Sequence, residues 1–175
     1  MKSRFLGLIP RERSLLKWTL FFVLTALALT VDLVTKHIAE DRLVLGEVHE
    51  VLPFLSLQLT QNDGVAFGLL GGSTTVIVIA NVFAMLIVAL YVLLERRPVF
   101  GGIVGGAVLG GSLGNFIQRL SGDGHVTDFL KFPSWPNFNA ADVFIDVGLA
   151  ALVIGVIVEL VRSWREKKHN IESSG

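Results

Sequence analysis

The sequence predicts an all-α membrane protein with four transmembrane helices and a small extracytoplasmic β-sheet between the first two helices. Of its 175 residues, 52% are hydrophobic and only 17% are charged. The apolar residues form four long runs, each near the roughly 20 residues that a helix needs to cross the hydrocarbon layer. Backbone polar groups in lipid must be paired within the protein, so these uninterrupted runs indicate helices and exclude barrel strands.

The four helices are expected at about 16–36, 73–94, 99–120 and 141–161, within a single membrane domain that spans 1–175. The first run follows several basic residues, as a signal peptide would. It is too long for the apolar part of a cleavable signal, has no small-residue cleavage site, and precedes three further runs. We therefore expect it to remain as a membrane span.

Lysine and arginine are distributed unevenly around these runs. Eleven of the 15 lie before or just inside the first run, between the second and third, or after the fourth. The positive-inside rule then predicts that both termini are cytoplasmic. The other four lie on the outer side, where a functional explanation is needed: Lys36, Arg42, Arg119 and Lys131.

Composition also limits the kinds of partner and reaction that the chain can be expected to have. The formal net charge is zero, so no nucleic-acid partner is expected, and the basic residues are explained by topology and anionic lipid. The chain has no cysteine, which excludes disulfides and thiolate catalysis. His37, His49 and His125 lack the spacing of metal ligands, so we expect neither a metal nor another cofactor.

The two outer segments, at about 37–72 and 121–140, hold most of the polar residues and are where we expect a site. In the first, FLSLQLTQN alternates leucines with polar residues, the period of a strand with one apolar face. NDG at 62–64 then turns the chain, and Asp63 and Asp123, each beside a glycine, are interpreted as turn residues. The sheet would either pack over the helices or form a cradle for a substrate.

The third run carries two faces of small and polar residues. Gly111, Asn115 and Arg119 form one face that ends in polar side chains at the outer surface, and these should point into the bundle. The neighbouring face has a glycine every four residues, which lets another helix backbone approach closely: Gly102, Gly106, Gly110 and Gly114.

Several aspartates lie at the outer membrane edge. Asp32 and Lys36 are spaced as an i, i+4 ion pair, which either anchors the helix end at the interface or takes part in chemistry. Asp128 lies among hydrophobic residues in HVTDFL, where an unpaired charge is costly. Asp142 lies in the first turn of the fourth helix, three residues after a candidate N-cap, Asn139, and on spacing alone a capping role is favoured over catalysis.

Two carboxyl groups that share a site cannot easily both ionise. One then keeps a proton near neutral pH while the other activates water, which is the chemistry of an aspartic peptidase. The alternative is a serine activated by a lysine, for which no spacing gives support. Its candidates are Ser56 or Ser121 with Lys131 or Lys36.

Five segments occur in the order DLVTK (32–36), NDGVAFG (62–68), GGSLGNFIQRL (110–120), HVTDFL (125–130) and FNAAD (138–142). Together they resemble the lipoprotein signal peptidase family, or signal peptidase II. The resemblance implies an aspartic peptidase that cleaves the signal peptide from diacylglyceryl-modified prolipoproteins, just before the lipidated cysteine. It also implies four spans, an outer β-cradle, and an active site at the outer face of the bacterial cytoplasmic membrane.

The resemblance assigns roles to single residues. Asp128 and Asp142 would be the catalytic pair. No metal or other cofactor is implied, and the expected partners of a monomer are the prolipoprotein and membrane lipid. The residues that would support the site or bind substrate are Asp32, Lys36, Asn62, Gly64, Gly111, Asn115, Arg119 and Asn139.

Two positions depart from the family pattern. Gln118 stands where G-N-x-x-D-R has an acid, and Val143 stands where a serine commonly follows the aspartate. The expected pair is intact, so we expect activity; the alternative is an impaired member that acts as a lipoprotein-binding scaffold. A channel or carrier would need polar residues across the midplane, and the second and fourth runs offer little beyond Asn81.

Asp146 lies one turn after Asp142 and is not explained by the family motif. An ionised carboxylate at this depth needs a partner. One hypothesis is that Asp146 pairs with Arg119 across the third and fourth helices and replaces the missing acid. The other is that a neutral Asp146 is hydrogen-bonded within the bundle.

Overall fold

The computed structural model describes residues 11–64, 74–121 and 124–172. Its elements are α1 (Arg11–Arg42), β1 (Val48–Leu52), β2 (Leu55–Asn62), α2 (Thr74–Leu94), α3 (Pro98–Ser121), β3 (Val126–Lys131) and α4 (Ala140–Glu172). In the described residues, four helices are long and apolar enough to cross a membrane, which confirms the predicted fold class. The expected turn at Asp123 lies outside the described residues.

The helix boundaries follow the apolar runs except at two ends. α1 continues to Arg42 and α4 to Glu172, well past the expected ends at 36 and 161. Hydropathy marks the part of a helix that lies in lipid, whereas the polar extensions are also built of residues that favour helix. The helix therefore continues beyond the hydrocarbon layer.

α3 is the centre of the bundle. In its most apolar window 61% of residues are buried, against 17% or less in the other three helices. The glycine face explains this position, because a Cβ on Gly102, Gly106 or Gly110 would lie 2.6 Å from a main-chain oxygen of α1. A Cβ on Gly111 would lie 2.5 Å from the Ala141 oxygen of α4. Both predicted faces thus allow close packing against neighbouring helices.

The outer segments form an antiparallel three-stranded sheet in the order β1-β2-β3. The predicted strand in FLSLQLTQN is β2. The sheet is not confined to the segment between the first two helices, because β3 comes from the connection between α3 and α4 and pairs Asp128 with Thr60 of β2. Leu59 and Phe129 pack against Ala39 near the end of α1, so the apolar face of the sheet covers that helix.

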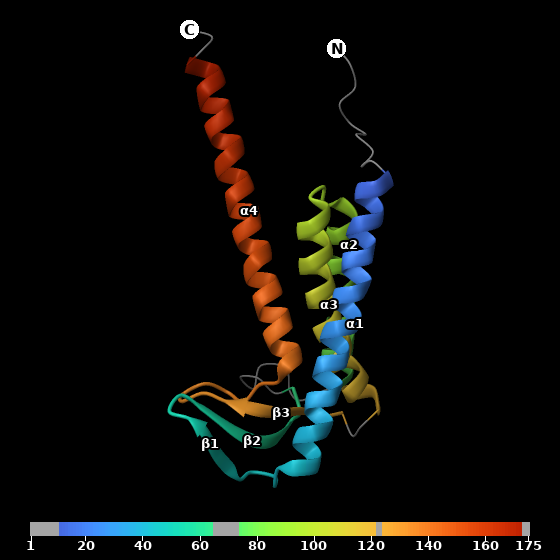
Figure 1. Cartoon of the computed structure of the whole chain (residues 1–175), viewed down its shortest axis with the longest axis vertical. Helices are drawn as coiled ribbons and strands as arrows, with labels where there is room; N and C mark the ends of the chain where they lie inside the picture. Colours follow the sequence, from blue (N-terminus) through green and yellow to red (C-terminus); the bar gives the residue numbers. More distant parts are fainter. Residues whose placement is uncertain (1–10, 65–73, 122–123, 173–175) are drawn as a thin grey trace.

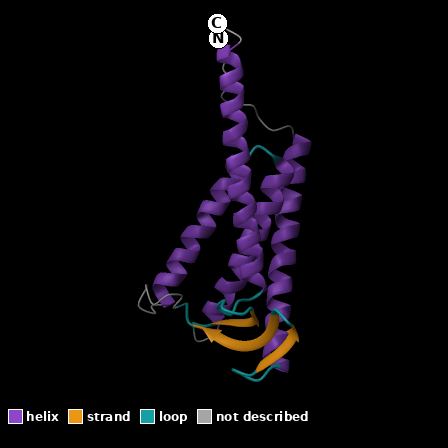
Figure 2. Ribbon diagram, turned by 90° about the vertical axis from the view of Figure 1, so that its left-hand side faces the viewer, coloured by secondary structure: helices purple, strands orange, loops and turns teal. Residues whose placement is uncertain are grey.

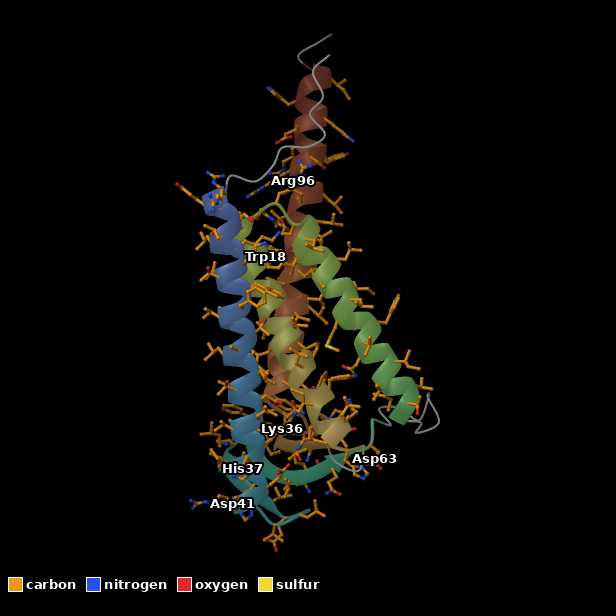
Figure 3. All side chains as sticks on the ribbon, turned by 90° about the vertical axis from the view of Figure 1, so that its right-hand side faces the viewer. Trp18, Lys36, His37, Asp41, Asp63 and Arg96 are labelled. Atoms are coloured by element: carbon orange, nitrogen blue, oxygen red, sulfur yellow. The ribbon has the colours of Figure 1, made fainter. Side chains whose placement is uncertain are left out.

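The sheet lies across one end of the helices, while the start of α1 and the end of α4 lie toward the opposite end (Figures 1 and 2). α4 packs against α3 from Ala141 to Gly155 and then extends beyond the other helices (Figure 1). Lys36 and Asp63 lie at the sheet end, and Trp18 and Arg96 lie toward the other (Figure 3). The polar residues of the predicted site are therefore gathered at the sheet end.

Candidate active site

Buried polar side chains from α1, α3, β3 and the start of α4 meet beneath the sheet. Each exposes 7% or less of its surface: Asp32, Lys36, Asn115, Asp128 and Asn139. Buried polar groups are costly unless they are hydrogen-bonded to one another. The hydrogen bonds of this cluster show how the predicted residues are brought together.

Asn139 connects the two aspartates of the predicted pair. Its Oδ1 accepts a hydrogen bond from the Asp142 N–H (3.0 Å), and its own N–H donates to Asp142 Oδ2 (3.1 Å), which is a reciprocal cap at the start of α4. Its Nδ2 also donates to Asp128 Oδ1 at 2.6 Å. The predicted cap is therefore confirmed, and Asn139 contacts both carboxyl groups, that of Asp128 through its side chain and that of Asp142 through its main-chain N–H.

Asp128 is held from its other side by the end of β2. Asn62 Nδ2 donates to Asp128 Oδ2 (2.9 Å), and Asn62 Oδ1 accepts from the Gly64 N–H (2.8 Å). Gly64 has φ +77°, and a Cβ there would lie 2.3 Å from the Ile77 side chain, so this turn requires glycine. Burial raises the pKa of Asp128 to about 6, the Asn62 hydrogen bond opposes this shift, and the Asp142 charge adds to it.

The Asp32–Lys36 pair is part of the same cluster. Lys36 Nζ donates to Asp32 Oδ2 and to Asn115 Oδ1, both at 2.7 Å. Asp32 Oδ1 accepts from the Ala141 N–H (2.9 Å), and Asn115 Nδ2 donates to Asp142 Oδ1 (2.8 Å). The expectation of an interfacial anchor is wrong, because the pair is buried and links α1, α3 and α4.

Arg119 of α3 lies at the edge of the cluster. It is half-buried, and its Nε has no hydrogen-bond partner in the described part of the chain. Its charge interacts with those of Asp128 and Asp142, and its Nη2 would lie 3.3 Å from a Cβ added at Gly64. The guanidinium is therefore beside the aspartate pair.

Asp146 does not take the part that the sequence suggested. It is exposed on α4, and within residues 11–64, 74–121 and 124–172 it forms neither an ion pair with Arg119 nor a hydrogen bond inside the bundle. Both hypotheses for Asp146 are wrong, because α4 turns this residue away from α3 while Ile145 packs toward Gly111.

Two contacts were missed by sequence reasoning. Asp63, interpreted only as a turn residue, also contacts His125 across the ends of β2 and β3. Gln118, noted only as a departure from the family pattern, bonds to Thr127, the neighbour of Asp128. The first contact depends on the pairing of β2 with β3, and the second depends on how the chain returns from α3 into β3, and the sequence carries no local signal for either.

The serine alternative finds no support in the geometry. Lys36 is committed to Asp32 and Asn115, while Lys131 Nζ donates to Gln58 Oε1 at 2.7 Å. Ser121 Oγ donates to a carbonyl of its own helix at 2.8 Å. No serine–lysine hydrogen bond occurs in the described residues.

Two aspartates joined by one asparagine, at the end of a four-helix membrane bundle, are the arrangement that a membrane aspartic peptidase needs. The family model described as Signal peptidase (SPase) II matches residues 24–158, and the chain belongs to this signal peptidase II family.

Curated relatives agree with this assignment. The chain is 34% identical over 163 residues to the lipoprotein signal peptidase of Mesorhizobium japonicum, an alignment that covers 87% of this chain and 92% of the relative. It is also 34% identical over 157 residues to the Brucella ovis lipoprotein signal peptidase, which covers 86% and 94%.

Two solved structures are similar in fold. Both are bacterial membrane enzymes determined by the in meso method, at 2.3 Å and 1.9 Å resolution. The first has a TM-score of 0.72 and 26% identity over 79% of this chain and 87% of that chain. The second has a TM-score of 0.70 and 27% identity over 77% and 90%.

Proposed function

We propose that this chain removes signal peptides from diacylglyceryl-modified prolipoproteins, cleaving before the lipidated cysteine, with Asp128 and Asp142 as the catalytic pair. Membership of the signal peptidase II family and relatives named lipoprotein signal peptidase support the reaction and the substrate. The observation that carries the catalytic assignment is Asn139, which is hydrogen-bonded to both carboxyl groups, to that of Asp128 through its side chain and to that of Asp142 through its main-chain N–H.

The proposed chemistry uses one proton shared by the pair. The ionised carboxylate takes a proton from a water molecule, whose oxygen attacks the carbonyl carbon before the lipidated cysteine. The protonated carboxyl gives its proton to the carbonyl oxygen. Collapse of the tetrahedral intermediate, with proton transfer to the departing amine, breaks the C–N bond. The raised pKa of Asp128, about 6, is consistent with one member of the pair retaining a proton.

The surrounding residues have supporting roles in this proposal. Asn62 and Asn139 orient Asp128, and Asn115 with Lys36 and Asp32 fixes the start of α4 that carries Asp142. Arg119 has a free Nε beside the pair and can donate to a main-chain carbonyl of the bound signal peptide. Gly64 and Gly111 allow close approach where a side chain would collide.

The lipid anchor explains why the site lies at a membrane boundary. Each buried methylene holds a diacylated cysteine in the leaflet by about 0.8 kcal/mol, so the aspartates must lie where lipid, peptide and water meet. Exposed apolar side chains on and beside the sheet suit contact with the lipid surface, among them Val51, Leu52, Phe54 and Trp135. We place the site at the outer face of the cytoplasmic membrane, with both termini cytoplasmic, and expect a monomer to act alone.

The scaffold alternative has no observation in its favour. Gln118 and Val143 leave the hydrogen bonds of both aspartates intact, and Val143 is exposed. A scaffold would bind the lipidated precursor without releasing a signal peptide.

The test is cleavage by the purified protein in lipid, with a diacylglyceryl prolipoprotein as substrate and release of the signal peptide as the readout. Asp128→Asn and Asp142→Asn should each abolish release while the protein stays folded, because an amide cannot exchange the proton that activates water. Asp146→Asn, on the same helix but exposed, is the matched control and should retain activity. Turnover by either of the first two variants would overturn the assignment.

A further inference from the structure

Glu40, Gln118 and Thr127 form a closed ring of hydrogen bonds beside the aspartate pair. Gln118 Nε2 donates to Glu40 Oε1 (2.9 Å) and to Thr127 Oγ1 (2.7 Å). The Thr127 N–H donates to Gln118 Oε1 (2.9 Å), and Thr127 Oγ1 donates to Glu40 Oε1. Both Gln118 N–H groups and both Thr127 donors thus have acceptors within the ring.

The ring joins three elements at the residue before Asp128. Glu40 belongs to the last turns of α1, Gln118 to the last turn of α3, and Thr127 to β3. β3 is an edge strand of the sheet. The Thr127 N–H donates to the Gln118 side-chain oxygen, which serves as an acceptor in place of the carbonyl of a further strand. Successive side chains of a strand point to opposite faces, so the ring holds β3 from the face opposite to the Asp128 carboxyl.

We propose that Glu40 is a positioning residue for the cleavage reaction, which acts through Gln118 and Thr127 to fix the place of Asp128. This inference rests on the proposed function. An amide side chain can turn over and exchange its oxygen and nitrogen. Glu40, which only accepts hydrogen bonds when ionised, holds the Gln118 nitrogen toward α1 and thereby keeps the Gln118 oxygen toward the Thr127 N–H.

The ring also explains why glutamine is suitable at position 118, where the family pattern has an acid. An acid at 118 could accept from Thr127 but could not donate to Glu40, and two carboxylates would then face each other. Glu40 and Gln118 therefore form a matched pair, with the carboxylate supplied by α1 rather than by α3. The exposed Asp146 has no part in this exchange.

The first experiment measures kcat and KM of Glu40→Ala on a diacylglyceryl prolipoprotein in lipid. We expect kcat to fall about tenfold, because small misplacements of a catalytic group are costly. KM should stay unchanged, because the ring holds β3 from the far side of the aspartate. Asp41→Ala removes the adjacent acid, which is also exposed, and should keep the parent kcat.

The second experiment is a rescue that a merely structural role would not produce. Gln118→Glu alone should lower kcat more than Glu40→Ala, because it places two carboxylates together. Glu40→Gln combined with Gln118→Glu exchanges amide and acid, gives every donor an acceptor, and should restore kcat to within about twofold of the parent. Thermal unfolding of each variant reports any loss of folded protein separately.

A parent-like kcat in Glu40→Ala, or a double variant no better than Gln118→Glu, would overturn the inference. So would a fall in kcat fully explained by unfolding. If Asp128→Asn is inactive while Glu40→Ala matches the parent, only this inference fails. If Asp128→Asn retains turnover, the proposed function fails first.

Discussion

The two aspartates of the pair are identical in covalent structure but lie in different surroundings. Asp128 belongs to a strand, exposes 2% of its surface, and accepts hydrogen bonds from two asparagine side chains. Asp142 belongs to the first turn of a helix and accepts from Asn115 and from the Asn139 N–H. Burial dominates at Asp128 and raises its pKa to about 6. Different environments of this kind allow one carboxyl to hold a proton while its partner remains ionised.

This pKa predicts a pH dependence of stability. Between the unfolded pKa, 3.8, and about 6, the folded protein keeps a proton on Asp128 that the unfolded chain has lost. The stabilisation is therefore complete below about pH 4 and is lost as the pH rises through 6, by on the order of 3 kcal/mol. Thermal unfolding in detergent from pH 4 to 7 should show this fall in the parent and lack it in Asp128→Asn. Equal pH slopes in the two proteins would contradict the prediction.

Single-residue reasoning from the sequence found local contacts and missed distant ones. The cap between Asn139 and Asp142 was predictable, because its two partners are three residues apart. The bond from Asn139 to Asp128 was not, because it requires β3 to lie beside the start of α4. The i, i+4 spacing likewise predicted that Asp32 and Lys36 pair, whereas their burial comes from α3 and α4, which cover them.

The buried ion pair predicts a non-additive effect on stability. Lys36→Met leaves Asp32 buried without its cation and should cost about 3–5 kcal/mol, whereas Lys36→Met with Asp32→Asn should cost less than the two single changes together. Unfolding in detergent measures each free energy. Lys131→Met, at a less buried lysine of β3 bonded to Gln58, is the control and should change stability by under about 1 kcal/mol. Strictly additive losses would mean that the pair does not interact.

At the scale of elements, α3 organises the molecule through its glycine faces. The face toward α1 brings the two helices close enough for Lys36 of α1 to reach Asn115 of α3. The face at Gly111 brings in the start of α4, where Asp142 lies. The same glycine faces of α3 therefore allow close helix packing and bring the site residues together.

Gly110→Ala should separate α1 from α3. Its new methyl group would lie 2.6 Å from the Thr25 oxygen and 2.7 Å from the Ala28 Cβ, so a helix must shift, at a cost of about 1–3 kcal/mol. We expect a lower unfolding temperature and slower cleavage, because Asn115 lies little more than one turn away. Ile103→Ala, on the exposed face of the same helix, should have a much smaller effect. Parent-like stability of Gly110→Ala would show that this face tolerates side chains.

Whole elements were predictable in proportion to their length. A run of apolar residues long enough for lipid identifies a membrane helix by itself, and all four helices were found. The alternation in β2 was long enough to identify a strand, whereas the six residues of β3 contain the aspartate and too little alternation to stand out. The polar ends of α1 and α4 have no hydrophobic signal, so their length was underestimated.

At the scale of the whole molecule, the two ends of the helical bundle differ. The sheet lies at one end of the helices, and the start of α1 and the end of α4 lie toward the other (Figure 1). Asp128 belongs to β3 of that sheet, and Asp142 to the first turn of α4 beside it. The ERRP connection between α2 and α3 lies toward the end where α1 begins and α4 ends, as the position of Arg96 shows (Figure 3). The side of the membrane that holds the termini therefore also decides which side holds the site.

The charge distribution predicts that side. The basic residues of the termini and of the ERRP connection should stay in the cytoplasm, which places the sheet and the aspartates outside. Reporter fusions after Glu95 and Gly175 should read cytoplasmic, and a fusion at Gly46, in the turn before β1, should read external. Gly46 lies in an exposed turn where a Cβ would meet no atom within 4 Å, and the fusion should retain this glycine because its φ is +83°. A cytoplasmic signal at Gly46 would put Asp128 and Asp142 on the inner side, where they could not act at the outer leaflet. The proposed location would then be wrong even if the pair cleaves prolipoproteins in vitro.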